Sequence, residues 1–587
     1  AVQISMANTI WDGAAWSNGA PNINTMAIIN GLYDTSTNGN FIACSLIINT
    51  NVGAGSEYRL NIANNTFVQI ENNTTVAGEL YVQTQGAFVQ NNDNALFSVV
   101  GGTALVNKST TPLNSIHDYT YWSSPVQNAM VQDGLAFANP NRRYWFNASN
   151  FLDVLMEVGN TNTYVAGSDG IDDNADAWTL VTDGTDIMTP GLGYASMHSP
   201  VGFVSGTQYT YTFTGPFNTG IVNAPIAYNG ANGDEDWNLI GNPYPSAIDA
   251  VAFLNNNNTT IGGAVYLWSH NTAANSSTSG NQNYNFSQND YAIITNGSGN
   301  TAGGDMTIPN NYIPSGQSFF VQGLSNTNVV FNNVLRMADG TSNTQFFRTS
   351  TNANRLWVNL TSDNGVFNQI LVAYVDGATN ARDNSSYDVR RSLYTENAAV
   401  IYTVIDDDTD RFAIQGKAPE SLTLEEIIPL GFETSITVPT LYSFSIAQFE
   451  GDFFESNTVY LKDNLLDTIH DLSLSDYTFT SETGDFSTRF EIIFNPNLLS
   501  VDTFESNTNL VSIIQLQTNT LQFIVPNTLT LKSIKLFDVL GRELYHLHGR
   551  NNSNVETFEL SYLSQATYIA QIELSNGKTI SKKVTIR

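Results

Sequence analysis

Short apolar runs recur within the first hundred residues, and they constrain the possible fold of this chain more than any other feature. The runs are residues 46–48, 60–62, 67–70, 80–82 and 88–89. Leu60 and Leu80 are twenty residues apart, and Phe67 and Phe88 are twenty-one apart, with Asn, Gly and Thr filling the stretches between. Runs this short, bounded by turn residues, indicate strands, and a fixed spacing indicates stacked repeats. We therefore predict a short β-solenoid with two strands per repeat.

A solenoid needs covered ends, and two tryptophans near the start of the chain are candidates for one cover. Trp11 and Trp16 lie five residues apart among Gly and Asn. This composition disfavours a helix and favours a packed cap. A sugar-stacking platform is the alternative interpretation. The other end of the stack would be closed by the residues that follow Val100.

Strand patterns continue through the rest of the chain. Residues 119–347 hold short aromatic runs separated by Gly, Pro and Asn, and residues 355–494 hold enough apolar runs for a sandwich. One helix is predicted, over residues 246–254, with Ser246 as its N-cap. We predict an all-β, multidomain protein. Its parts are a β-solenoid-like region (1–115), an aromatic-rich all-β domain (116–350), a β-sandwich (351–495), a linker (496–509) and a C-terminal domain (510–587).

Composition argues against several classes of partner. The 587 residues are 41% hydrophobic, which is enough for real cores, and the formal net charge is −31. Phosphate binding needs clustered Lys and Arg, so nucleic acid and anionic membrane surfaces are not expected partners. The single cysteine, Cys44, excludes an intrachain disulfide framework, and its apolar surroundings predict a buried structural thiol.

No membrane-spanning or leader segment is expected from the sequence. No apolar run approaches the roughly 18 residues that a transmembrane helix needs. The first residues lack the basic and apolar pattern of a signal peptide. Our hypothesis is that the numbering starts at a mature N-terminus, after removal of a leader.

The last part of the chain has its own strand pattern and its own charge. Residues 533–536 alternate polar and apolar side chains up to a break at Gly541, and residues 566–574 and 579–586 flank an Asn-Gly turn typical of a hairpin. Residues 532–587 hold eight Lys or Arg and five acids, a local net of +3, so the remainder carries −34. A basic end on an acidic chain predicts that this end meets different partners.

At these residues the chain resembles a known family, the type A C-terminal sorting domains of the type IX secretion system of Bacteroidetes. The resemblance lies in "LFDVLGREL", in "LSQATYIAQI" and in the closing "NGKTISKKVTIR". Ala566 stands where the family usually has Gly, and residues 511–514 stand in place of its usual opening motif. The resemblance implies a small Ig-like β-sandwich that directs export across the outer membrane and is normally removed by a sortase. The phrases "YWSSPV", "WNLIGNPYPSAID" and "PSGQSFFVQ" also resemble a segment of many type IX cargo proteins.

The resemblance implies which residues dock on the export apparatus. Its expected partners are the type IX outer-membrane translocon and a cargo-shuttle β-barrel. The implied docking residues are Asp538, Gly541, Arg542, Tyr568, Lys582 and Lys583. Purely structural interpretations remain open, in which Gly541 forms a turn, Tyr568 lies in the core, and Lys582 and Lys583 end a solvated strand.

Catalytic and metal signatures are sparse. The six histidines are scattered, with no His-Glu-x-x-His and no Gly-x-Ser-x-Gly, so we predict no catalytic residue and no enzyme. A hydrolase with paired carboxylates leaves no short signature and stays an alternative. Asp172, Asn174 and Asp176 form the best candidate Ca²⁺ site, although Ala177 replaces the glycine of an EF-hand loop. A second acidic run, residues 406–410, is a further candidate, and a plain acidic turn is the alternative for both.

Together these observations predict a secreted or cell-surface protein exported by the type IX system. Its predicted role is that of an adhesin or surface-interaction protein that binds glycans or protein partners. One alternative is an accessory subunit retained at the translocon or the gliding machinery. Another alternative is a glycan-degrading enzyme.

Overall fold

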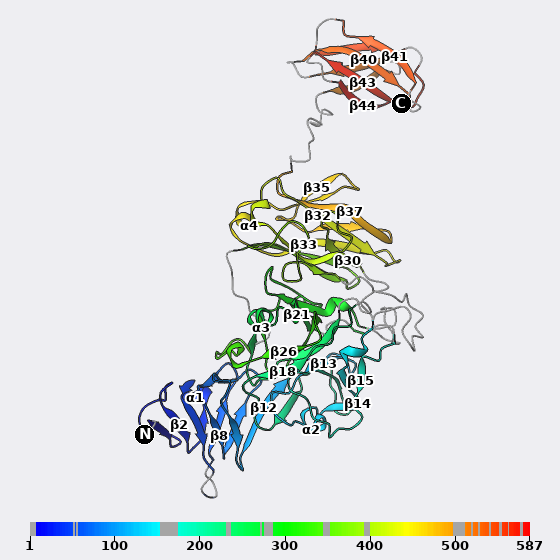
Figure 1. Cartoon of the computed structure of the whole chain (residues 1–587). Coiled ribbons are helices and arrows are strands. Elements are labelled where there is room, and N and C mark those ends of the chain that lie inside the picture. Colours follow the sequence, from blue (N-terminus) through cyan, green and yellow to red (C-terminus); the bar gives the residue numbers. More distant parts are fainter. Residues whose placement is uncertain are drawn as a thin grey trace. The chain divides into compact units, whose positions relative to one another are not determined.

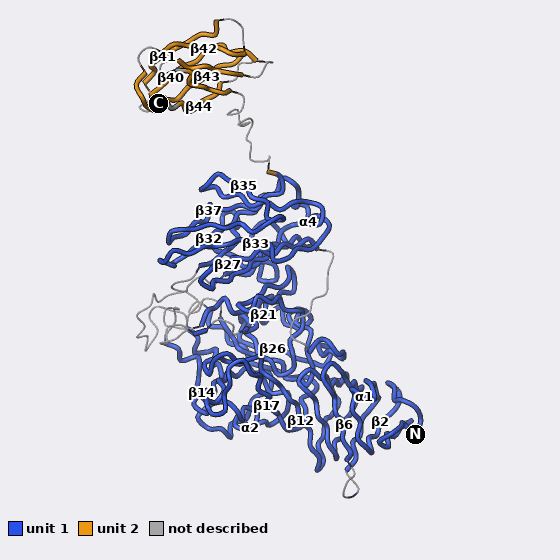
Figure 2. The backbone as a smooth tube through the Cα atoms, turned by 180° about the vertical axis from the view of Figure 1, so that it is seen from behind, with its two compact units in different colours: residues 1–495 blue, residues 496–587 orange. Residues whose placement is uncertain are grey.

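The regular secondary structure of the computed structural model is almost entirely β-strand, as predicted (Figure 1). It describes residues 7–50, 53, 57–152, 174–230, 236–269, 273–274, 286–343, 353–391, 399–496, 511–517, 520–525, 529–538, 542–550, 554–560, 563–575 and 579–586. The chain forms two compact units, residues 1–495 and residues 496–587 (Figure 2). No helix in the described ranges is long and apolar enough to cross a membrane.

The N-terminal part of the first unit is a solenoid with three strands per coil. One stack is β1 (Asn8–Trp11), β2 (Met26–Ile29), β5 (Ser45–Ile48), β8 (Thr74–Val76) and β11 (Phe97–Val99). The second is β3 (Tyr33–Asp34), β6 (Arg59–Ile62), β9 (Glu79–Val82) and β12 (Thr103–Ser109), and the third is β4 (Phe41–Ala43), β7 (Phe67–Ile70) and β10 (Ala87–Gln90). The predicted two strands per repeat were wrong, because strands such as Thr74–Val76 hold a single strongly apolar residue and escape a search for apolar runs.

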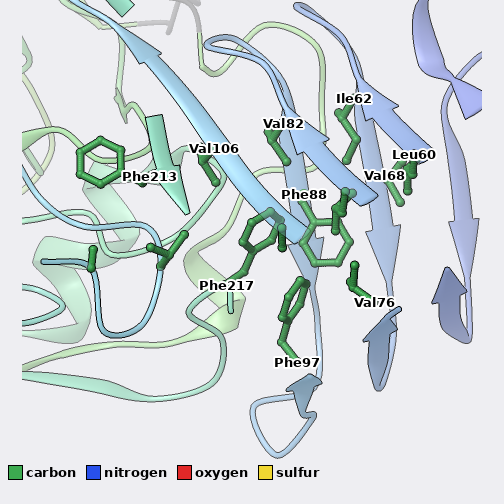
Figure 3. Packing of buried hydrophobic residues seen from close by; sticks show 14 of the residues in the cluster. Leu60, Ile62, Val68, Val76, Val82, Phe88, Phe97, Val106, Phe213 and Phe217 are labelled. Atoms are coloured by element: carbon green, nitrogen blue, oxygen red, sulfur yellow. The ribbon is translucent and has the colours of Figure 1, made fainter. Parts of the chain in front are cut away.

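The register of the coils follows the spacing in the sequence. Leu60 pairs with Leu80, as the twenty-residue spacing predicts, whereas Phe88 pairs with Val68 and not with Phe67. Every second residue points inward, and these side chains form an apolar core between the three stacks (Figure 3). At one corner, a Cβ on Gly102 would lie 2.3 Å from the carbonyl oxygen of Gly78, so successive coils approach too closely there for a side chain.

Aromatic residues close the N-terminal end of the solenoid. The ring centroids of Trp11 and Trp16 lie 5.6 Å apart, and both rings pack against Tyr33. The indole N–H of Trp11 donates to the carbonyl oxygen of Leu32. Cys44 was predicted to be buried but is half-buried, because it lies at the corner between β4 and β5.

The far end of the solenoid continues into the aromatic-rich region. Strand β17 (Thr210–Thr214) pairs antiparallel with β12, the last strand of its stack. Phe213 and Phe217 enter the solenoid core, and Phe217 stacks on Phe97 with centroids 4.6 Å apart. One continuous core therefore runs from Trp11 to Phe217.

The aromatic-rich region contains several small sheets. The first has the order β13 (Tyr119–Trp122), β16 (Tyr194–His198), β14 (Ala138–Phe146), β15 (Trp178–Leu180). The second has the order β19 (Trp237–Gly241), β25 (Ser318–Gly323), β21 (Ile261–Trp268), β22 (Tyr291–Thr295), β23 (Asn300–Thr301). Two short pairs complete it: β18 (Val222–Pro225) with β26 (Asn328–Phe331), and β20 (Ile248–Asp249) with β24 (Tyr312–Ile313).

The predicted helix begins later than expected. Helix α3 spans Ala250–Asn256, and its N-cap is Asp249, which accepts from the backbone N–H of Ala252. Ser246 is not the cap, because residues 248 and 249 form β20 and the Ser246 hydroxyl accepts from Arg336. The other α-helices in the described ranges are α1 (Thr35–Asn38), α2 (Val131–Gly134) and α4 (Asp452–Ser456).

The last part of the first unit is one eleven-stranded sheet that bends around a core. Its order is β35 (Thr468–Asp471), β34 (Tyr460–Asp463), β37 (Gly484–Ile493), β32 (Ile427–Thr434), β30 (Ala399–Thr403), β31 (Phe412–Lys417), β28 (Phe367–Tyr374), β27 (Asn354–Ser362), β33 (Leu441–Glu450), β36 (Tyr477–Thr480), with β29 (Val389–Arg390) on β31. Register shifts interrupt the long pairs β27–β33 and β32–β37. Such bulges bend strands, which lets a single sheet enclose its own core.

The second unit is a seven-stranded sandwich over its described residues. One sheet is β38 (Ser512–Gln517), β39 (Thr520–Ile524), β42 (Val555–Glu559). The other is β41 (Glu543–His548), β40 (Leu531–Phe537), β43 (Thr567–Leu574), β44 (Thr579–Thr585). Buried aliphatic and aromatic side chains from both sheets form its core, as in Ig-like sandwiches.

The inward row of the solenoid predicts a matched pair of stability effects. Leu80 is fully buried in that row, whereas Ser98 on β11 is half-buried. We expect Leu80→Ala to lower the free energy of unfolding by about 2–5 kcal/mol, and Ser98→Ala to change it by less than about 0.5 kcal/mol. Urea unfolding followed by tryptophan fluorescence measures both, because all eight tryptophans lie in the first unit. Equal effects of the two substitutions would contradict this assignment of the inward row.

Candidate ligand-binding pocket

A pocket of about 770 Å³ opens where the last coil of the solenoid meets the aromatic-rich sheets. Its walls come from distant parts of the sequence, from Asn64 in a solenoid turn to Asn343 after the second sheet. Side-chain amides line it from Asn64, Gln85, Asn114, Gln208, Gln317 and Asn343. Most of the other lining residues are serines, threonines, two tryptophans and a tyrosine. This volume lies in the range of small-molecule sites.

One wall of the pocket is the end of the solenoid. Strand β12 alternates, so Ala104, Val106 and Lys108 share the inward row. Ala104 and Val106 lie in the solenoid core, and Lys108, at the end of that row, lines the pocket. The ammonium nitrogen of Lys108 lies 2.6 Å from the carbonyl oxygen of Thr84 in the preceding coil, to which it donates. The wall is further tied together by a 3.0 Å hydrogen bond between the hydroxyls of Thr84 and Ser109.

Lys108 is in an unusual electrostatic position for a lysine. Its side chain is 6% exposed, and burial lowers the pKa of its amine to about 7. Desolvation has this effect because it disfavours the charged form. Within the described part of the chain, no ion pair to Lys108 is formed. The amine can therefore change its charge near neutral pH.

Another part of the lining is aromatic. The rings of Tyr121 on β13 and Trp268 on β21 stack with centroids 5.9 Å apart. Tyr291 braces both, since its hydroxyl lies 3.0 Å from that of Tyr121 and its ring centroid lies 5.0 Å from that of Trp268. Burial raises the pKa of Tyr121 well above its usual value, so its hydroxyl stays neutral at physiological pH.

Backbone anchors hold these walls in place. The amide of Asn343 donates to the carbonyl oxygen of Gly86 over 2.7 Å, and its oxygen accepts from the backbone N–H of Ser315 over 3.0 Å. Asn64 accepts from the backbone N–H of Gln85 over 2.9 Å, which joins two stacked turns of the solenoid. Asp305 is the one carboxylate in the lining, and burial raises the pKa of its carboxyl group. These bonds to the backbone fix the positions of Asn343 and Asn64 in the lining.

Of the predicted calcium ligands, Asn174 and Asp176 lie within the described residues. Asp172 lies outside the described residues. Asn174 accepts from the backbone N–H of Asp176 over 2.9 Å, which is the hydrogen bond of an Asx-turn. Over the described ranges, no group of three or more His, Cys, Asp or Glu side chains could hold a metal ion. In the second acidic run, Asp408 and Asp410 both pair with Arg382.

In the second unit, Asp538 and Arg542 close the turn between β40 and β41. Asp538 accepts from the backbone N–H of Arg542 over 2.9 Å and from its Nε over 2.7 Å. The Arg542 side chain is 73% exposed and that of Asp538 is 14% exposed. Gly541, predicted for the same turn, lies outside the described residues. Arg542 is therefore the accessible member of this pair.

Tyr568 lies in the core of the second unit. It is 4% exposed, and its hydroxyl donates to the carbonyl oxygen of Ser564 over 2.9 Å. A tyrosine near the start of a strand that bonds backbone a few residues upstream is the tyrosine corner of Ig-like sandwiches. The geometry gives Tyr568 a structural role in the sandwich.

Lys582 and Lys583 face opposite sides of β44. Lys582 pairs with Ala570, and its ammonium donates to the carbonyl oxygen of Val511 over 2.6 Å. Lys583 pairs with Ile569, which is 44% exposed, and is itself exposed. Of the two lysines, Lys583 is the one that a partner can reach directly.

Sequence reasoning missed Lys108 and the pocket around it. One signal was present, because Lys108 occupies the apolar phase of the alternating strand Thr103–Ser109. A lysine in that phase is either a strand end or a functional group, and only the tertiary structure distinguishes the two.

Solenoid and aromatic sheets together define an all-β protein, and the described residues of its first unit form a pocket of about 770 Å³. The chain belongs to the family described as Domain of unknown function (DUF8693), which matches residues 5–494. Domain of unknown function (DUF8694) matches residues 499–586. No curated protein matches the chain significantly. A solved structure described as "Biofilm associated protein - BSP domain" is 8% identical over 63% of this chain and 96% of that chain, with a TM-score of 0.11, too low to support a conclusion.

Burial of Lys108 predicts how stability changes with pH. Between about pH 7 and the ordinary lysine pKa of 10.5, the unfolded chain holds the Lys108 proton more tightly than the folded chain. The free energy of unfolding therefore rises with pH in this window, by up to about 1.4 kcal/mol per pH unit. We expect Lys108→Met to be more stable than the parent at pH 7, with a difference that shrinks towards pH 10. Urea unfolding at several pH values measures it, and a difference independent of pH would contradict the assignment.

The two faces of β44 predict different outcomes for its two lysines. We expect Lys582→Glu to destabilise the sandwich by about 1–3 kcal/mol, because it loses the bond to the Val511 carbonyl. Lys583→Glu should change stability by no more than about 0.5 kcal/mol, because its side chain is exposed. Hydrogen exchange of the β43–β44 amides, followed by mass spectrometry, distinguishes the two. Equal protection in both variants would contradict the placement of Lys582.

Proposed function

We propose that this protein is an exported surface protein that binds glycans in the pocket of its first unit. The observation that carries the proposal is the lining of that pocket, which combines the aromatic side chains of Tyr121 and Trp268 with six amides and several hydroxyls. Sugar hydroxyls both donate and accept hydrogen bonds. Amide and hydroxyl side chains can also do both, so they can pair with sugar hydroxyls in either direction. Aromatic rings bury the apolar face of a sugar ring.

The same lining favours binding over hydrolysis. Glycoside hydrolases ordinarily place two carboxyl groups on either side of the bond they cleave. Asp305 is the one carboxylate among the residues that line this pocket. An adhesin therefore agrees better with the pocket than a glycan-degrading enzyme.

In this proposal the second unit is the domain that directs export of the protein. Its seven-stranded sandwich over the described residues, and the motifs of residues 533–586, agree with the resemblance to type A sorting domains of the type IX system. Arg542 and Lys583 are the exposed members of the implied docking set. In this proposal they contact the outer-membrane translocon and its cargo shuttle, and the first unit reaches the cell surface or the medium.

Export is tested by fractionating native cells that make the full chain, a deletion of residues 499–587, or Lys583→Glu. We expect the full chain outside the outer membrane and the deletion variant retained in the periplasm. Because Lys583→Glu should leave the sandwich folded, reduced export of this variant would locate docking on that face. Export of the deletion variant at parental levels would overturn the sorting role. Recovery of the intact tail with translocon components would favour the retained accessory subunit.

Glycan binding is tested on arrays and then by calorimetry with the bound glycan. We expect Trp268→Ala to weaken binding at least about tenfold, or about 1.4 kcal/mol, because the sugar loses its aromatic platform. Trp145→Ala is the matched control, because Trp145 is half-buried on β14 and is not among the residues that line the pocket. Absence of binding to any glycan, or unchanged affinity of Trp268→Ala, would overturn the proposal.

A further inference from the structure

We propose that the pocket selects anionic sugars, whose carboxylate or sulfate group is held by Lys108. This inference rests on the proposed glycan-binding function and specifies its ligand class. It is drawn from the position of a single amine at the end of the solenoid core.

Lys108 is a buried amine with most of its bonding capacity unused. An ammonium group has three N–H donors. Thr84 accepts one of them, and no other hydrogen bond from the Lys108 side chain is formed within the described residues. An uncompensated charge at 6% exposure is costly, and a counter-charge with hydrogen-bonding oxygens removes that cost. An anion that contacts Lys108 therefore gains more binding free energy than a neutral group at the same position.

The other charged groups near the pocket do not supply this counter-charge. The titratable groups in the lining besides Lys108 are Tyr121 and Asp305. Tyr121 is neutral at physiological pH, and no oxygen of Asp305 forms an ion pair with Lys108 in the described structure. Burial also raises the pKa of the Asp305 carboxyl group above its usual value.

The strongly negative net charge of the chain means that an anion is attracted only where a basic side chain such as Lys108 contacts it. With 53 acidic and 22 basic residues, the protein repels anions at long range. Salt screens such repulsion beyond about 8 Å at physiological ionic strength, so a contact inside the pocket depends on its own lining. Selectivity for an anionic sugar then has to come from Lys108, the one basic side chain in that lining.

Paired ligands that differ only in charge test the inference. A trisaccharide of galacturonic acid is compared with its methyl ester, and dextran sulfate oligosaccharides with dextran oligosaccharides of equal length. At pH 6.5, by titration calorimetry, we expect the anionic member of at least one pair to bind at least tenfold more tightly. The pair that shows the preference identifies carboxylate or sulfate as the recognised group.

Substitutions test whether Lys108 causes a preference for the anionic ligand. Lys108→Met keeps the length of the side chain and should abolish the preference, while Lys532→Met, an exposed lysine of the second unit, should leave it unchanged. A second measurement uses the unaltered protein, so it does not depend on variant folding. Its affinity for the preferred anion should fall as pH rises from 6.5 to 9, while affinity for a neutral partner that binds should stay constant.

The outcomes separate this inference from the proposed function. Equal affinity for charged and neutral partners, or a preference that survives Lys108→Met, overturns the role of Lys108 while glycan binding stands. An anion affinity that does not change with pH overturns it as well. Failure of all glycans to bind overturns the glycan-binding function itself.

Discussion

Stacking of inward apolar side chains is the interaction on which the first unit depends. Each coil of the solenoid covers the apolar edge of its neighbour, so the last coil would expose its edge to water without a further cover. Strand β17 supplies that cover by pairing with β12, and Phe217 fills the end of the core against Phe97. The pocket lies beside this cover, since Lys108 pairs with Tyr211 of β17 at the end of the inward row and also lines the pocket.

Buried polar anchors make the regions of the first unit a single body. Arg336 is 6% exposed and donates to the carbonyl oxygen of Phe88 over 2.6 Å, which joins the aromatic-rich region to the solenoid. The indole of Trp357 donates to the carbonyl oxygen of Asn300 over 2.7 Å, which joins the eleven-stranded sheet to the second aromatic sheet. Groups of this kind are favourable only with their partners in place, so they define how the regions meet. Such bonds between regions suit a pocket whose walls come from several of them.

The second unit shows how one sequence motif can hold both structural and accessible residues. Tyr568 and Lys582 bond to backbone carbonyls within the sandwich, while Arg542 and Lys583 stay exposed. For the two lysines, alternation along β44 is the reason, since neighbouring residues of a strand face opposite sides. A sorting signal read by a partner would therefore use alternate positions of the motif, and the intervening positions would maintain the fold.

The sequence alone determined the local features of this protein. Alternation and turn residues predicted strands almost throughout, and the spacing of Leu60 and Leu80 predicted a register that the coils adopt. Three strands per coil, the later start of α3 at Ala250 and the pocket were decided by tertiary contacts. A strand such as Thr74–Val76 is stabilised by its neighbours in the stack and not by its own apolar content. The pocket required the folded chain, because its walls are joined by contacts between residues far apart in sequence, and no local pattern records which distant segments meet.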